Sequence, residues 1–194
     1  KFMKHSLLQT TIGLYRVVAE KDNPTFAVSK GQLGGLVSNP DNLSQDGLAW
    51  IAYNASCIDG SRVLEDAYVG GNALLAAGAV VAGQSYVTGD ALLEGCVTVR
   101  DAVTIDGTAV LLNNAVVKDA AHLTTGGLVR GNSVISGTST INQVVKRHAK
   151  LHDVQQFEPI STEMAYAQIA FDFVHAVEMS NQSIRYSQYR EELL

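Results

Sequence analysis

Apolar residues recur at every sixth position between residues 51 and 141, with no insertion or deletion to interrupt the pattern. A second column, two residues before the first, is small at nearly every step, mostly Ala or Ser. Helices and heptad coiled coils need apolar periods of about 3.6 and 3.5 residues, so neither explains a strict period of six. The sixteen members of the first column are Ile51, Cys57, Val63, Val69, Leu75, Val81, Val87, Leu93, Val99, Ile105, Leu111, Val117, Leu123, Val129, Ile135 and Ile141.

Each six-residue unit reads as a very short strand followed by a corner. Side chains alternate between the two faces of a strand, so two positions spaced by two point to the same side. The corners carry Gly, Asn and Asp, which tolerate turns and left-handed backbone conformations, as in Gly71-Asn72 and Gly89-Asp90. The pattern therefore predicts a repetitive solenoid of short strands over residues 49–142.

This repeat resembles the hexapeptide-repeat class of left-handed parallel β-helix proteins, in which three hexads make one triangular turn. The resemblance implies a prism of about five turns for the sixteen hexads. The entry segment KGQLGGLVSNPDNLSQDGLAWIAYNAS is similar to that of the uncharacterised YdcK-like family of bacterial and phage-borne β-helix proteins, with matches that include Gly31, Gly34, Gly35, Trp50 and Asn54. This second resemblance supports the architecture and transfers no catalytic residue.

The predicted fold is an all-β solenoid, a left-handed parallel β-helix with an N-terminal cap and a C-terminal α-helical appendage. Residues 1–48 form the cap, with a strand at residues 14–19, because the open end of a solenoid exposes unpaired backbone groups. Residues 143–194 break the hexads and form a connector and helices, with Ser161 or Thr162 as a helix N-cap.

One outward face of the predicted prism is apolar. It carries Leu74, Leu92, Val110 and Leu128, with Ile58 and Leu112 beside them, and the predicted C-terminal helix has an apolar stripe of Tyr166, Ile169, Phe173 and Val177. Long apolar strips on soluble proteins mark interaction sites, so we expect both surfaces to be buried in one assembly. The helix could fold back onto the prism of its own chain, or the strip could join chains; a homo-oligomer is favoured, and the resemblance implies a trimer.

Composition limits the kind of partner. The chain is 46% hydrophobic and 17% charged, with a net charge of −5, which argues against a nucleic-acid groove because such grooves are basic. No apolar run is long enough to span a membrane, so a cytoplasmic protein without membrane or nucleic-acid partners is expected. Cys57 and Cys96 fall in different columns, so no disulfide is expected.

Candidate chemistry is sparse. His122 is the only histidine in the repeat and takes an outward position, where a general base could act, but Thr104 and Thr140 at the matching positions of adjacent turns supply no orienting carboxylate. His148 and His152 stand four residues apart and could present two metal ligands on a helix, although the surrounding basic residues would repel a cation. Both candidates are therefore weak, and no cofactor is expected.

Two functions remain open. Uninterrupted repeats without a catalytic constellation favour a non-catalytic scaffold, a rigid prism that presents a helical C-terminal element for oligomerisation or for a protein partner. The alternative is an acyltransferase that uses coenzyme A or an acyl carrier protein, as the resemblance to hexapeptide-repeat enzymes implies.

Overall fold

The computed structural model describes residues 3–155 of the 194-residue chain. Regular structure in this part is almost entirely β, with two single-turn 3₁₀ helices in the cap. The elements are β1 (His5–Gln9), β2 (Tyr15–Ala19), η1 (Pro24–Phe26), β3 (Leu33–Val37), η2 (Pro40–Asn42), β4 (Trp50–Ile51), β5 (Ser56–Cys57), β6 (Arg62–Val63), β7 (Tyr68–Val69), β8 (Leu74–Ala76), β9 (Val80–Val81), β10 (Tyr86–Val87), β11 (Leu92–Glu94), β12 (Thr98–Val99), β13 (Thr104–Ile105), β14 (Val110–Leu112), β15 (Val116–Val117), β16 (His122–Leu123), β17 (Leu128–Val129), β18 (Val134–Ser136), β19 (Thr140–Ile141) and β20 (Lys150–His152).

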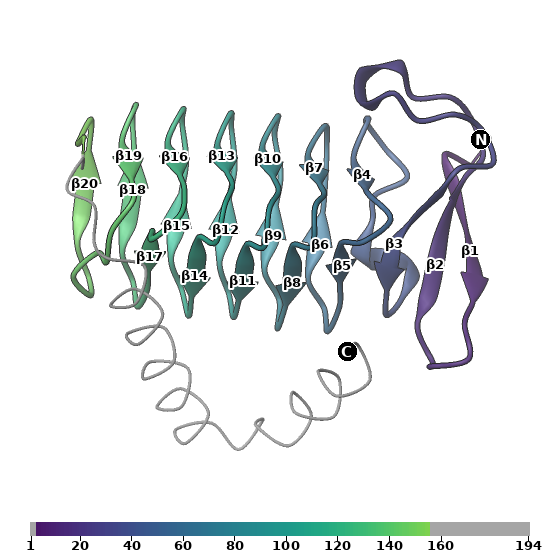
Figure 1. The fold of residues 1–194 in the computed structure, drawn as a ribbon, viewed down its shortest axis with the longest axis horizontal. Helices are drawn as coiled ribbons and strands as arrows, with labels where there is room; N and C mark the ends of the chain where they lie inside the picture. The colour runs from purple at the N-terminus through teal and green to yellow at the C-terminus, as the bar shows by residue number, and fades with distance from the viewer. Residues whose placement is uncertain (1–2, 156–194) are drawn as a thin grey trace. The chain divides into compact units, whose positions relative to one another are not determined.

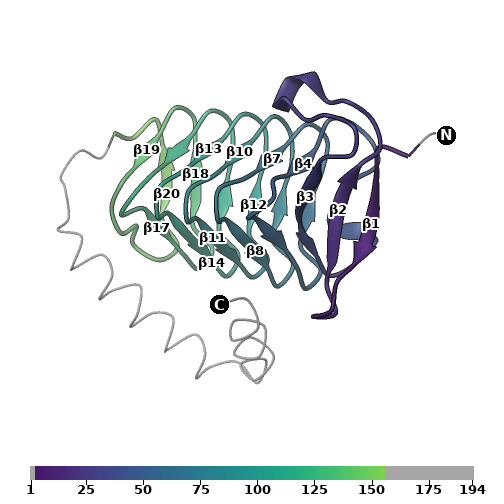
Figure 2. The same ribbon diagram turned by 45° about the vertical axis from the view of Figure 1, so that its right-hand side comes forward.

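The strands build three sheets that form the three sides of a solenoid (Figures 1 and 2). Sheet A has eight strands in the order β1-β2-β3-β5-β8-β11-β14-β17; sheet C runs β20-β18-β15-β12-β9-β6, and sheet D runs β19-β16-β13-β10-β7-β4. Pairing is parallel except where β2 meets β1 and β3. Each turn contributes one strand to each sheet, which gives a parallel solenoid of about six turns.

Residues eighteen apart lie side by side, as where Leu93 pairs with Leu75 and Leu111. This register stacks the apolar column along the axis of the solenoid. All sixteen residues of the predicted inward column have 0% exposure. The small column is also buried, so the core consists of a line of large aliphatic side chains with Ala and Ser between them. The predicted inward register is confirmed.

Gly89 lies at a corner where successive turns approach closely. Gly89 has φ +69°, and a Cβ there would collide with the backbone of Gly107 in the next turn. Only glycine adopts this backbone region freely, and only glycine leaves room for the neighbouring chain. Backbone conformation and turn-to-turn spacing therefore both favour glycine at Gly89, although Asp101 and Asp119 occupy the same position of other hexads, also with positive φ.

The solenoid is longer than predicted: it has about six turns, whereas the hexads indicated about five. At the N-terminal end, β3 already pairs in parallel with β5, and at the other end β20 pairs with β18 beyond Asn142. The hexad count missed this extension because strand pairing needs extended backbone and an apolar inward residue, not a strict spacing of six. Val145 is buried and Leu151 packs against the core, although both lie in the segment where the hexads fail.

The cap is a β-hairpin followed by two loops. The strand expected at residues 14–19 is present as β2, paired with β1 on one side and β3 on the other. The cap therefore continues sheet A rather than forming a separate layer. The predicted C-terminal helices, with Tyr166, Ile169, Phe173 and Val177, lie outside the described residues.

Candidate functional site

A histidine and a carboxylate form a hydrogen-bonded pair on the outer face of sheet D. His122 lies on β16, directly beside Thr104 on β13, and Asp106 follows β13 by one residue. The imidazole Nε2 lies 2.8 Å from Asp106 Oδ2, with 41% and 37% of the two side chains exposed. The sequence analysis correctly found no carboxylate at the matching positions, Thr104 and Thr140, but it missed Asp106. It considered only residues directly beside His122, whereas the carboxylate lies diagonally, two residues further along the preceding turn.

The surroundings of Asp106 keep it ionised. Partial burial opposes ionisation, but hydrogen bonds from the Thr124 hydroxyl and from His122, together with the attraction of His122, outweigh it and lower the pKa of Asp106. An ionised carboxylate orients the imidazole ring and favours a proton on Nε2. The second nitrogen, Nδ1, is then the one that can accept a proton or a hydrogen bond.

Aromatic side chains precede this pair on the same face. Trp50, Tyr68 and Tyr86 occupy successive outward positions of β4, β7 and β10. The Tyr68 and Tyr86 rings are stacked, with centroids 4.5 Å apart and planes 9° from parallel, and Phe26 of the cap packs against Tyr68 at 5.0 Å. Burial, the proximity of Tyr86 and a hydrogen bond with it raise the pKa of the Tyr68 hydroxyl. The sequence analysis did not identify this stack.

The two other histidine candidates do not form a metal site. His148 and His152 do not lie on a helix: His148 is in a turn with φ +60°, and His152 is in β20. His148 Nδ1 accepts a hydrogen bond from the Asn132 N–H at 3.4 Å, whereas the ring nitrogens of His152 face Ser136 Oγ at 3.0 Å and Asp153 Oδ2 at 3.1 Å. Within residues 3–155, no group of three or more His, Cys, Asp or Glu side chains could hold a metal ion.

Sheet A carries an apolar row on its outer face, as the hexads predicted. Leu74 and Leu92 are half-buried, whereas Val110 and Leu128 are buried, with Ile58 and Leu112 buried beside them. The row also extends into the cap, because strand register places Leu8, Arg16 and Leu36 in line with Ser56 and Leu74. We call the eight residues Leu8, Arg16, Leu36, Ser56, Leu74, Leu92, Val110 and Leu128 the outer row. The sequence analysis missed its cap members because the cap lacks the hexad spacing.

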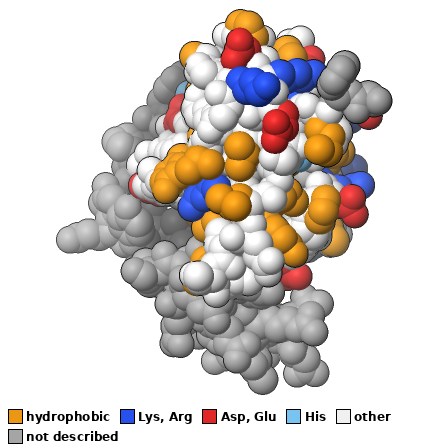
Figure 3. Space-filling view, turned by 90° about the vertical axis from the view of Figure 1, so that its right-hand side faces the viewer, with side chains coloured by type: hydrophobic (Ala, Val, Ile, Leu, Met, Phe, Trp, Pro, Cys, Tyr) orange, Lys and Arg blue, Asp and Glu red, His pale blue; other side chains and the backbone are white. Residues whose placement is uncertain are grey.

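Exposed hydrophobic side chains concentrate at the N-terminal end of the solenoid. Among the described residues, the large hydrophobic side chains with high exposure are Met3, Leu8, Ile12, Leu33, Leu48, Tyr53 and Tyr86. All except Tyr86 belong to the cap or the first turn. Figure 3 looks onto this end and shows hydrophobic side chains in several patches between charged ones. One of these exposed aromatic side chains is partnered, because the Arg16 guanidinium lies 4.2 Å above the ring of Tyr53.

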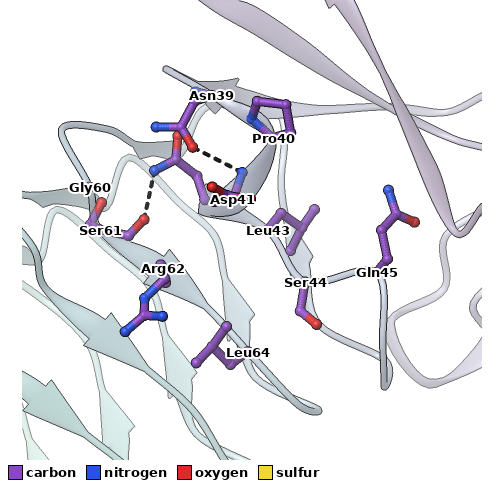
Figure 4. A pocket seen from close by; sticks show the side chains of 11 residues that line it. Asn39, Pro40, Asp41, Leu43, Ser44, Gln45, Gly60, Ser61, Arg62 and Leu64 are labelled. Carbon is purple, nitrogen blue, oxygen red and sulfur yellow. Dashed lines mark hydrogen bonds between the residues drawn. The ribbon is translucent and has the colours of Figure 1, made fainter.

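A hollow of about 580 Å³ opens between η2 and β6 (Figure 4). Its walls include both an acid and a base, Asp41 and Arg62, and its rim is held by hydrogen bonds from Asp41 N–H to Asn39 Oδ1 and from Asn42 Nδ2 to the Ser61 carbonyl. None of the buried polar atoms without a partner in residues 3–155 lines this hollow. Its mixed charge and satisfied polar groups point to no particular ligand.

Comparison with protein-family models and with curated proteins finds no match to this chain. The fold is therefore established by the structure itself, as a parallel β-solenoid. Over residues 3–155, no helix is both long and apolar enough to cross a membrane.

Proposed function

We propose that the protein is a non-catalytic scaffold of the left-handed hexapeptide-repeat class, which assembles with further copies of itself through the outer face of sheet A. The observation that carries this proposal is the outer row, which places six aliphatic side chains among its eight positions across all eight strands of one sheet. Leu8 is exposed and Leu36, Leu74 and Leu92 are half-buried, whereas Val110 and Leu128 are already buried. The part of the row that is open to a second chain therefore runs from the cap to Leu92, and such apolar strips mark interaction sites. A second surface for a protein partner would be the C-terminal segment, whose sequence alone supports it.

The other two faces of the solenoid do not offer such a strip. On sheet C, the outward valines are interrupted by Thr98, and the row ends at Arg62 and Lys150. On sheet D, the outward aromatic residues of β4, β7 and β10 are followed by Thr104, His122 and Thr140. Contact through sheet A would remove the accessible surface of Leu8, Leu36, Leu74 and Leu92 from water, and burial of apolar surface is the main driving force for stable association. A closed ring of three chains is the arrangement that the resemblance to hexapeptide-repeat proteins implies.

Light scattering on the full chain tests this proposal. The parent is expected at three times the 20.7 kDa of one chain, and a double variant, Leu74→Glu with Leu92→Glu, is expected at one chain mass. Val80→Glu with Thr98→Glu is the matched control, because these residues occupy the same two turns six positions further along, on sheet C. A parent that elutes as a monomer, or a sheet A variant that keeps the parent's mass, would contradict the proposal.

An acyltransferase is the second candidate, and the hydrogen bond between His122 and Asp106 favours it. A histidine oriented by a carboxylate is suited to remove a proton from an acceptor hydroxyl or amine. Calorimetry with acetyl-coenzyme A separates the two functions. Saturable binding at micromolar concentration, together with transferase activity that His122→Ala abolishes, would support the enzyme and overturn the scaffold.

A further inference from the structure

The aromatic stack on sheet D ends abruptly at a threonine. Outward positions of five successive strands hold Trp50, Tyr68, Tyr86, Thr104 and His122. Thr104 thus lies between two ring-bearing residues, and its side chain is too short to continue the stack. We call this position the Thr104 step.

The spacing of the stack matches the size of a missing ring. Tyr68 and Tyr86 are one strand apart, and their ring centroids lie 4.5 Å from each other. Adjacent strands lie about 4.8 Å apart, so the backbone positions of Tyr86 and His122, two strands apart, are separated by about 9.5 Å. A ring placed over Thr104 would lie about one stacking distance from Tyr86, and would also lie next to His122.

Tyr86 presents a free ring face toward this step. Tyr68 covers the face of Tyr86 that looks back along the solenoid, so the opposite face looks toward Thr104. Tyr68 is half-buried, and Phe26 packs against it. Tyr86 has 43% exposure and is the only large hydrophobic side chain of high exposure among the described residues beyond the first turn. The stack is therefore anchored in the cap and open at Tyr86.

Charge restricts what can bind there. His122 is tied to Asp106 at 2.8 Å, so a carboxylate lies beside the step, and the chain carries a net charge of −5. A ring bearing phosphate or carboxylate groups would be repelled, whereas an uncharged ring with a hydrogen-bond donor would find acceptors nearby. These conditions suit a tyrosine or tryptophan side chain better than a nucleotide.

We propose that the Thr104 step is a docking site for one aromatic side chain, tyrosine or tryptophan, of a partner protein. The inserted ring stacks on Tyr86 and is bordered on its other side by the His122 imidazole. This site lies on sheet D and needs neither oligomerisation through sheet A nor any acyl chemistry. A negative result for this docking site would therefore leave the proposed scaffold function unaffected, and a monomeric protein would leave the docking site unaffected.

The test is an NMR titration of the ¹⁵N-labelled full chain with N-acetyl-tryptophanamide. We expect weak, saturable binding with amide shifts confined to residues near Tyr86, Thr104 and His122. Tyr86→Ala should weaken binding by about tenfold or more, because the stacking surface is lost. Thr104→Tyr should fill the step with its own ring, abolish binding and leave the protein folded, because a tyrosine is favourable at an outward strand position.

Thr140→Tyr is the matched control, since Thr140 lies on the same face beyond His122 and should leave binding unchanged. The proposal is overturned if the amide shifts are scattered over the surface, or if Thr104→Tyr binds as the parent does while its spectrum shows a folded protein. It is also overturned if methyl glycosides bind at the step and N-acetyl-tryptophanamide does not, which would make this a sugar site.

Discussion

The side chain of Gln45 hydrogen-bonds to the backbone of His5 as a neighbouring strand would. Gln45 Nε2 donates to the His5 carbonyl at 2.9 Å, and Gln45 Oε1 accepts from the N–H groups of Lys4 at 2.8 Å and His5 at 3.4 Å. β1 is the terminal strand of sheet A, and an unpaired strand edge is a template for unwanted pairing. Gln45 thus closes part of this edge with a side chain from a loop forty residues away.

Replacing Gln45 by Ala should loosen the cap while the turns of the solenoid stay intact. The variant leaves partly buried backbone groups of Lys4 and His5 without partners, which costs about 1–3 kcal/mol. Hydrogen exchange should show the loss as faster exchange in β1 and β2, with little change in sheet D. Gln32→Ala is a suitable control, because Gln32 is an exposed cap residue whose side chain accepts an exposed hydrogen bond from the Ser29 N–H. Equal protection of β1 in both variants would show that Gln45 does not hold this strand.

Acid should destabilise the cap through His5. His5 has 1% exposure, and burial together with the charge of Lys4 lowers its pKa from 6.5 to about 4. The unfolded chain then binds more protons than the native protein between pH 6.5 and 4, so stability is fully present above 6.5 and falls as the pH decreases through this window. The loss is up to about 3 kcal/mol. Asp106 and Asp153 have a lowered pKa and titrate below this window.

Urea unfolding at pH 7 and pH 4.5 measures this effect, with His5→Gln as the comparison. The parent should lose more stability than the variant, because only the parent has a buried imidazole to protonate. Lys4 does not contribute to the difference, because burial, followed by the charge of Lys21, lowers its pKa only to about 8, and the group is protonated at both pH values. An identical loss in parent and variant would mean that His5 is not the source.

The repeat made the core predictable, but the candidate sites depend on geometry that the repeat does not encode. The sixteen inward residues followed from a period of six, because each position in a regular solenoid has the same environment in every turn, whereas the three-sided turn was implied by the resemblance to hexapeptide-repeat proteins. The contact between Asp106 and His122 is diagonal, and it depends on side-chain rotamers rather than on register. The alignment of Leu8 with the outer row depends on the antiparallel pairing of β1 and β2, which has no hexad signal.

Adjacent residues of β12 provide a direct test of the inward register. Val99 has 0% exposure, whereas Thr98 points outward on sheet C and is half-buried. Val99→Asp would place a carboxylate in an apolar core without a partner, and the protein should lose several kcal/mol or fail to fold. Thr98→Asp should change stability by less than about 1 kcal/mol. Thermal unfolding of both variants measures the difference, and a cost at Thr98 equal to that at Val99 would refute the assigned faces.

A last pair of variants separates the two reasons for glycine at the corners. Gly60 and Gly89 have similar backbone angles, with φ of +75° and +69°. A Cβ on Gly60 would meet nothing within 4 Å, whereas a Cβ on Gly89 would collide with the carbonyl oxygen and the backbone nitrogen of Gly107.

Gly60→Ala should therefore cost only the strain of a left-handed backbone, about 1–2 kcal/mol. Gly89→Ala should cost distinctly more, because the turns must also move apart and lengthen the ladder hydrogen bond from the Asp90 N–H to the Gly107 carbonyl, 2.8 Å in the parent. Urea unfolding gives both values. If the two substitutions cost the same, backbone strain alone explains the glycines, and the close approach of successive turns is not a constraint on the sequence.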